Sequence, residues 1–134
     1  MKILICSLLF VLATSSCTLN SGVSDYSNQV TISGTWIWQK STGGLTGSDL
    51  VTPVSTGETR KLVFTNGDKV TAYTNSVETG NYTYQIVIGK GIFDEKDQYL
   101  LKFNEMTYVI EYIDHNNLIL DNNFPDGYRI TYRR

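Results

Sequence analysis

The chain has 134 residues, a length that suits one domain and is too short for two. Its formal charge is −2 at pH 7, and its lysines and arginines are scattered except for Arg133 and Arg134 at the end. No basic field is therefore available to hold nucleic acid, and a nucleic-acid-binding role is excluded.

Residues 1–16 have the pattern of a secretory signal peptide, with Lys2 at the start and an apolar run over residues 3–13. This run is too short to cross a bilayer, which takes roughly 20 apolar residues. Small residues then lead to Cys17, and the segment ATSSC is similar to a bacterial lipobox. That similarity implies cleavage before Cys17 and acylation of its thiol, which would hold the protein on a membrane. Ordinary signal cleavage, with an incidental Cys17, is the alternative.

Cysteine content agrees with lipidation. Cys6 would leave with the signal peptide, so Cys17 would be the only cysteine of the mature chain and no intramolecular disulfide is expected. Residues 17–32 are rich in Ser, Asn and Gly and predict a flexible tether from lipidated Cys17. The folded domain is expected over residues 33–134.

The first predicted strand covers residues 34–40 and carries both tryptophans of the protein. Alternation places Trp36 and Trp38 on one face, where they need a deep surface to bury them, and Ile37 on the other. Residues 43–57 form a long connection. Its apolar side chains predict that it folds back onto the body of the domain: Leu45, Leu50, Val51 and Val54.

The rest of the chain alternates between apolar and polar residues in short segments separated by turn signals. Asn66-Gly67 predicts a hairpin with a type I′ turn, and Asn104-Glu105 a tight turn. Eight strands follow from this pattern: residues 34–40, 58–65, 69–73, 80–88, 99–103, 106–113, 118–121 and 128–134. Short connections predict antiparallel neighbours. A sandwich is one solution, but eight short strands favour an all-β, eight-stranded antiparallel up-and-down barrel without exposed edges.

Large apolar and tyrosine side chains would share the inner face of this barrel. The candidate ligand-binding residues are Trp38, Tyr82, Tyr84, Tyr108 and Tyr112. Buried tyrosine hydroxyls need hydrogen-bond partners. They could bond to one another and to strand ends in a filled core, or they could meet a small amphipathic ligand in a pocket.

The two ends of the sheet are expected to meet. In a closed meander the first strand pairs antiparallel with the last, which brings Trp36 near Arg133 or Arg134. Arg134 has the inward phase of Tyr132, so its guanidinium is expected to lie on Trp36 in a cation–π contact. The alternative is a frayed terminal arginine in solvent.

A family resemblance becomes visible in these residues. The segment GTWIWQKSTGG, followed by Thr52-Pro53, Thr56-Gly57 and the strand LVF at residues 62–64, resembles the lipocalin superfamily. More narrowly, it resembles small lipocalin-like lipoproteins of Bacteroidetes-type bacteria. The resemblance implies a barrel in which Gly34, Trp36 and Arg134 form a structural signature at the closed end, with no catalytic role.

The sequence offers no obvious catalytic or metal site. His115 is the only histidine and lies in a predicted turn, so neither a catalytic pair nor a typical zinc cluster is expected. Asp94, Glu95 and Asp97 match no calcium loop and are expected to be solvated. The chain is therefore predicted to be no enzyme and to need no cofactor.

Two functions remain open. The first is a membrane-anchored binding module of the bacterial envelope that takes a small amphipathic ligand at the barrel mouth. The second is a filled barrel that acts through its outside or its loops as a protein-binding accessory or an inhibitor of an envelope enzyme. The residue after Cys17 does not resemble an inner-membrane retention signal, which implies the outer membrane, with either the periplasmic or the surface face.

Overall fold

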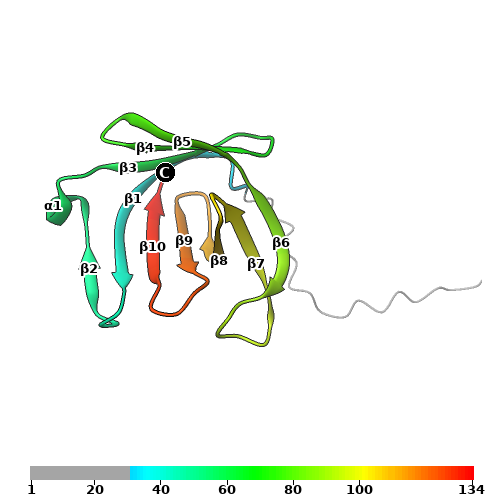
Figure 1. Ribbon diagram of the computed structural model, residues 1–134. Coiled ribbons are helices and arrows are strands. Elements are labelled where there is room, and N and C mark those ends of the chain that lie inside the picture. The colour runs from blue at the N-terminus through cyan, green and yellow to red at the C-terminus, as the bar shows by residue number, and fades with distance from the viewer. Residues whose placement is uncertain (1–30) are drawn as a thin grey trace, which may run out of the picture.

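The computed structural model describes residues 31–134 (Figure 1). The predicted signal peptide, Cys17 and most of the predicted tether lie outside the described residues. The described chain forms ten strands and one short helix: β1 (Gly34–Gly43), β2 (Asp49–Val51), α1 (Pro53–Thr56), β3 (Arg60–Phe64), β4 (Lys69–Thr74), β5 (Val77–Thr83), β6 (Gln85–Lys90), β7 (Asp97–Phe103), β8 (Met106–Ile113), β9 (Asn117–Asn122) and β10 (Tyr128–Arg133).

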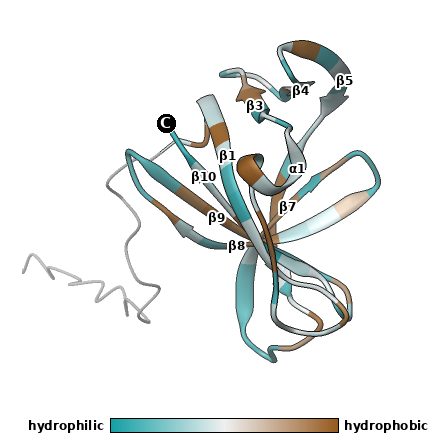
Figure 2. Ribbon diagram, turned by 90° about the vertical axis from the view of Figure 1, so that its left-hand side faces the viewer, coloured by the Kyte–Doolittle hydropathy of each residue, from teal (hydrophilic) through white to brown (hydrophobic). Residues whose placement is uncertain are grey.

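The strands form one antiparallel up-and-down sheet in the order β5-β4-β3-β1-β10-β9-β8-β7-β6, and β2 pairs with β1 beside this path. The all-β, antiparallel expectation is confirmed. The sheet curls into a half-barrel, so the prediction of a closed eight-stranded barrel is wrong. In Figure 2, β3, β4 and β5 lie together at the upper end of the molecule, away from the loops at the lower end.

The sheet does not close into a barrel because of the segment predicted as one strand over residues 80–88. It is interrupted at Tyr84, and its two parts bend away to different partners. β5 pairs with β4, whereas β6 pairs with β7. The two edges of the sheet therefore belong to consecutive strands, joined by the chain and not by a ladder of hydrogen bonds within the described residues.

The connection after β1 is more ordered than expected. Its backbone pairs with β1 through β2, and α1 then makes a single turn. The expectation that its apolar side chains fold back is wrong for three of them, because Leu45, Leu50 and Val54 are 83%, 61% and 95% exposed. Backbone pairing, and not apolar burial, attaches this segment.

Trp36 and Trp38 lie at the centre of the sheet, where β1 pairs with both β3 and β10. Both are almost fully buried, and Ile37 between them is exposed, as alternation predicts. The Trp36 indole Nε1 donates a hydrogen bond of 2.7 Å to the carbonyl of Ile32. Ile32 itself is buried in the core, so the folded part begins no later than Ile32, before the predicted end of the tether.

The first and last strands pair as expected, and the Arg134 guanidinium lies 4.2 Å from the centre of the Trp36 ring. Its Nη2 also donates to the carbonyls of Thr31 and Ser33, at 2.7 and 2.6 Å. Gly34 has φ +129, and a Cβ there would lie 3.3 Å from Arg134 Nε. Glycine thus leaves room for the guanidinium, and its backbone adopts a conformation that side chains disfavour.

A β-bulge changes the face of one predicted site residue. The register of β8 against β9 shifts between Ile110 and Tyr112, with Glu111 as the extra residue. Ile113 therefore packs against the core, and Tyr112 points outward, with its hydroxyl 2.9 Å from Asp114. The expectation that Tyr112 shares the inner face with Tyr108 is wrong, because a bulge reverses the alternation.

Replacing Arg134 with alanine is expected to lower the free energy of unfolding by about 2–4 kcal/mol, through loss of the cation–π contact and two charged hydrogen bonds. Arg133→Ala is the matched control, because Arg133 is an exposed arginine without these contacts to Trp36, Thr31 and Ser33, and its loss should cost less than about 0.5 kcal/mol. Urea denaturation of both variants measures the difference. Equal losses would contradict a specific role for Arg134.

Candidate functional site

The inner face of the half-barrel stays open beside β6. Ile86 and Ile88 pair with Leu101 and Tyr99, so they lie on the same face as buried Leu101. Yet Ile86 is 41% and Ile88 67% exposed. In a closed barrel further strands would cover these isoleucines; here they present apolar surface to whatever enters the inner face.

Aromatic side chains continue this inner face from β6 towards β3. Phe103 contacts Tyr108 in a stacked arrangement, with ring centres 5.2 Å apart, and Tyr82 at 6.2 Å. Phe64 meets Phe103 and Tyr84 edge to face, at 6.2 and 5.1 Å. The two phenylalanines thus form the buried floor of the cluster, and the tyrosines surround it.

The tyrosine hydroxyls differ in their partners. The Tyr84 hydroxyl donates to the carbonyl of Thr65 at 3.4 Å. Within the described residues, the hydroxyls of Tyr82, Tyr108 and Tyr132 have no hydrogen-bond partner, and no fully buried side-chain polar atom there is left unpaired. These three hydroxyls must therefore reach the surface of the inner face, where solvent or a ligand can pair with them.

Burial raises the pKa of both Tyr108 and Tyr132. For Tyr132 the neighbouring Tyr108 raises the pKa further, and the positive charge of Arg60 opposes the rise. Because a phenol ordinarily titrates near pH 10, both hydroxyls stay protonated at neutral pH. They can each donate one hydrogen bond and accept others.

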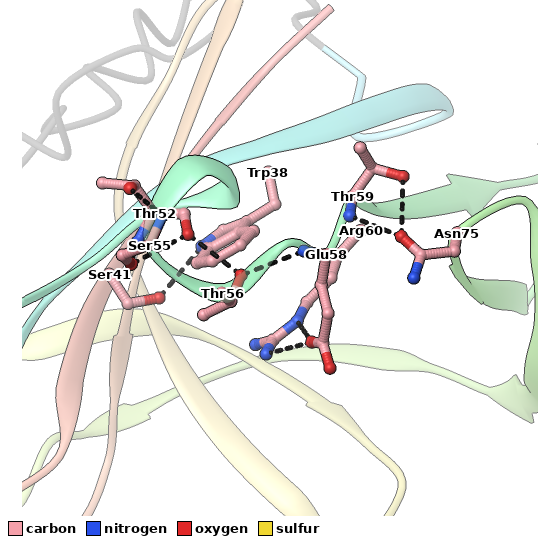
Figure 3. A network of polar contacts seen from close by, with 9 residues as sticks. All are labelled: Trp38, Ser41, Thr52, Ser55, Thr56, Glu58, Thr59, Arg60 and Asn75. Atoms are coloured by element: carbon pink, nitrogen blue, oxygen red, sulfur yellow. Dashed lines mark hydrogen bonds and ion pairs between the residues drawn. The ribbon is translucent and has the colours of Figure 1, made fainter.

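A cation, Arg60, lies beside Trp38 in this region (Figure 3). Its guanidinium lies 4.6 Å from the centre of the Trp38 ring and pairs with the Glu58 carboxylate at 2.7 Å. Arg60 is two residues before Leu62 on β3 and so has the inward phase of that buried side chain. The indole Nε1 of Trp38 donates a hydrogen bond of 3.0 Å to Ser41 Oγ.

Helix α1 positions Glu58. Thr52 caps the helix by accepting from the Ser55 backbone N–H, and Ser55 Oγ accepts in return from the Thr52 N–H. Gly57 ends the turn with φ +71, and the Glu58 N–H donates to Thr56 Oγ1 at 3.2 Å. The motif residues Thr52-Pro53 and Thr56-Gly57 therefore build the turn that sets the Glu58–Arg60 pair over Trp38.

The structure brings only part of the predicted site together. Tyr82 and Tyr108 contact Phe103, and Tyr84 contacts the neighbouring Phe64, so these three tyrosines share the inner face as the alternation predicts. Trp38 is buried under Arg60 on the side of α1, and Tyr112 lies on the outer face. Arg60 is not among the predicted site residues, although its spacing from Leu62 and Phe64 on β3 indicates an inward position.

The described residues were also searched for a metal site and for a membrane-spanning helix. No group of three or more His, Cys, Asp or Glu side chains that could hold a metal ion occurs among residues 31–134. No helix in the same range is long and apolar enough to cross a membrane.

In the turn before β9, backbone and side-chain N–H groups of Asn116 and Asn117 lower the pKa of Asp114 to about 2. The Asp114 carboxylate therefore orders the turn that contains His115.

Comparisons of the chain with protein-family models, with curated proteins and with the solved structures found no match.

Removing the unpaired hydroxyls is expected to leave stability almost unchanged. Tyr108→Phe and Tyr132→Phe should each alter the free energy of unfolding by less than about 0.5 kcal/mol, because no protein hydrogen bond is lost. Thermal and urea unfolding measure the effect, with Trp36→Phe as the control. That control loses the bond to Ile32 and part of a buried ring, and should cost about 1–3 kcal/mol. A large loss in either tyrosine variant would mean that its hydroxyl is structural.

Proposed function

We propose that the protein binds a small amphipathic molecule on the inner face of the half-barrel. The observation that carries this proposal is the coexistence of exposed Ile86 and Ile88 with unpaired tyrosine hydroxyls on one face. A folded protein normally covers large apolar side chains and pairs its polar groups. A ligand with an apolar body and a polar end would do both at once.

The proposal extends to cell address. Acylation of Cys17 would anchor this binding module to the bacterial envelope, with the outer membrane as its site. This part rests on the ATSSC segment and on the resemblance to lipocalin-like lipoproteins. A lipocalin-like carrier on a membrane would hold its ligand near the lipid surface from which amphipathic molecules come.

The binding test uses lauric acid as an anionic probe and monolaurin as a neutral one, each followed by tryptophan fluorescence and native mass spectrometry. Both tryptophans are buried near the inner face and should report occupancy. We expect saturable binding of at least one probe. Ile88→Glu should weaken it at least about tenfold, because a carboxylate would be desolvated by the ligand.

Ile37→Glu is the matched control for that variant. Ile37 is also an exposed isoleucine, but it lies on the outer face of the central strand β1, whereas Ile88 lies on the inner face of the edge strand β6. It should leave affinity unchanged. If neither probe binds, or if both variants behave alike, the inner face is not the binding site. The alternative, an accessory protein acting through the exposed Leu45, Leu50 and Val54, would then be preferred.

The anchor is tested separately by Cys17→Ala in the native host or a related one. Without the thiol no acyl chain can be attached, and each buried methylene contributes about 0.8 kcal/mol to membrane binding. The variant should move from the membrane fraction to the soluble fraction. Cys6→Ala, in the predicted signal peptide, is the control and should still give membrane-bound protein. Retention of the Cys17→Ala protein in the membrane would refute lipidation at this residue.

A further inference from the structure

A second site lies on the outer face of the sheet, opposite the candidate inner face. Its floor is a row of directly paired residues that crosses four strands: Thr42, Arg129, Asp121 and Val109. They point outward, because neighbours such as Leu120 pack in the core. The Arg129 guanidinium binds both carboxylate oxygens of Asp121, at 2.9 and 2.8 Å, and lies 3.6 Å from Glu111.

Two loops from the lower end of the sheet in Figure 1 form the walls of this site. The β6–β7 loop folds over β8, so that a Cβ on Gly91 would lie 3.4 Å from Val109. The Ile92 N–H then donates to Asn123 Oδ1, at 2.8 Å, which fastens this loop to the β9–β10 loop. The walls are thus held by packing and hydrogen bonding.

Between the walls lie two hollows of about 360 and 220 Å³. Both are lined by Phe93, Asp121 and Asn122, so they adjoin and form one groove. Phe93 is 78% exposed, and Phe124, which lines the larger hollow, is 40% exposed. Two exposed aromatic rings in one groove form an apolar surface that a folded chain normally covers.

The polar lining consists of planar groups with free donors. Asn122 Oδ1 accepts from the Tyr128 N–H, and Asn123 Oδ1 is occupied by the Ile92 N–H. Within the described residues this leaves both amide Nδ2 groups free to donate. The Gln98 Nε2 already donates to Asp94 Oδ2, whereas the outer edge of Arg129 adds further donors and Glu111 adds acceptor oxygens.

The charge of the groove limits its ligand. Three carboxylates, on Asp94, Glu111 and Asp121, face one guanidinium, so a polyanion would be repelled. Each carboxylate also has a partner: Arg129 for two of them, and Gln98 with the Lys96 N–H for Asp94. A cationic ligand would therefore find no unpaired carboxylate. The lining suits a neutral molecule with flat apolar faces and many hydroxyl groups.

We propose that this groove binds a neutral oligosaccharide. The apolar faces of sugar rings would stack on Phe93 and Phe124, and sugar hydroxyls would bond to the amides, to Glu111 and to Arg129. The open shape of the groove allows a chain of several sugar units to lie across it. This groove is separate from the inner face, so the proposal does not depend on whether the inner face binds an amphipathic ligand.

The test uses the purified full-length protein and cello-, malto- and mannohexaose, measured by isothermal titration calorimetry. At least one should bind saturably at millimolar concentration or below. Phe93→Ala and Phe124→Ala should each weaken binding about tenfold. Both side chains are exposed, so the variants should fold. Val54→Ala, an exposed apolar side chain on α1 outside the groove, is the control and should bind like the wild type.

Salt separates a neutral ligand from a charged one. Oligosaccharide affinity should not change between about 50 and 500 mM salt, because no net ligand charge is involved. Binding of none of the three hexasaccharides would overturn the proposal, as would equal effects of the Phe93 and Val54 variants. Salt-sensitive binding of polylysine to the same groove, lost in Glu111→Gln while the sugars fail to bind, would assign the groove to a cationic peptide instead.

Discussion

The contact between Trp36 and Arg134 joins the first and last strands, and much of the architecture depends on it. Trp36 is fully buried at the centre of the core, and only Trp38, also buried, matches its volume among the buried side chains of the described residues. Arg134 covers its ring and ties the carbonyls of Thr31 and Ser33 to the C-terminal end of the sheet. Because β1 and β10 are central in the sheet, this contact fixes the middle of the half-barrel and leaves its edges at β5 and β6.

This arrangement explains which parts of the fold could be predicted from sequence. Alternation in the first strand and the pairing of chain ends depend on local pattern and on short connections, and both predictions are confirmed. The tight turn at Asn104-Glu105 is also present, with φ of 50° and 60°. At Asn66-Gly67 the hairpin forms, but neither residue has positive φ, so the type I′ turn predicted there is wrong. Asn-Gly favours a type I′ turn, but here a longer loop connects the two strands and is closed by the hydrogen bond from the Thr65 N–H to the Lys69 carbonyl.

The remaining features depend on distant parts of the chain and have no local signal. Whether the sheet closes is decided by the bend at Tyr84, which divides a segment of uniform alternation between two partners. The outward position of Tyr112 follows from a bulge at Glu111, and nothing in the alternation of that strand marks the extra residue. The outer groove is assembled from loops some thirty residues apart, as the Ile92–Asn123 bond illustrates. Arg60 is the exception, since its spacing from Leu62 was sufficient to place it.

Because β5 and β6 do not pair, the half-barrel has an unpaired edge at β6, beside the inner face. An unpaired edge with apolar side chains tends to recruit another strand, and Ile86 and Ile88 on β6 meet that description. Two features limit the hazard: the chain itself runs from one edge to the other at Tyr84, and Lys90 places a charge at the end of β6. A small ligand that covers the isoleucines would shield the exposed apolar surface at this edge. For this protein, occupancy of the inner face and protection of the sheet edge would then be the same event, which gives a half-barrel a physical reason to remain open.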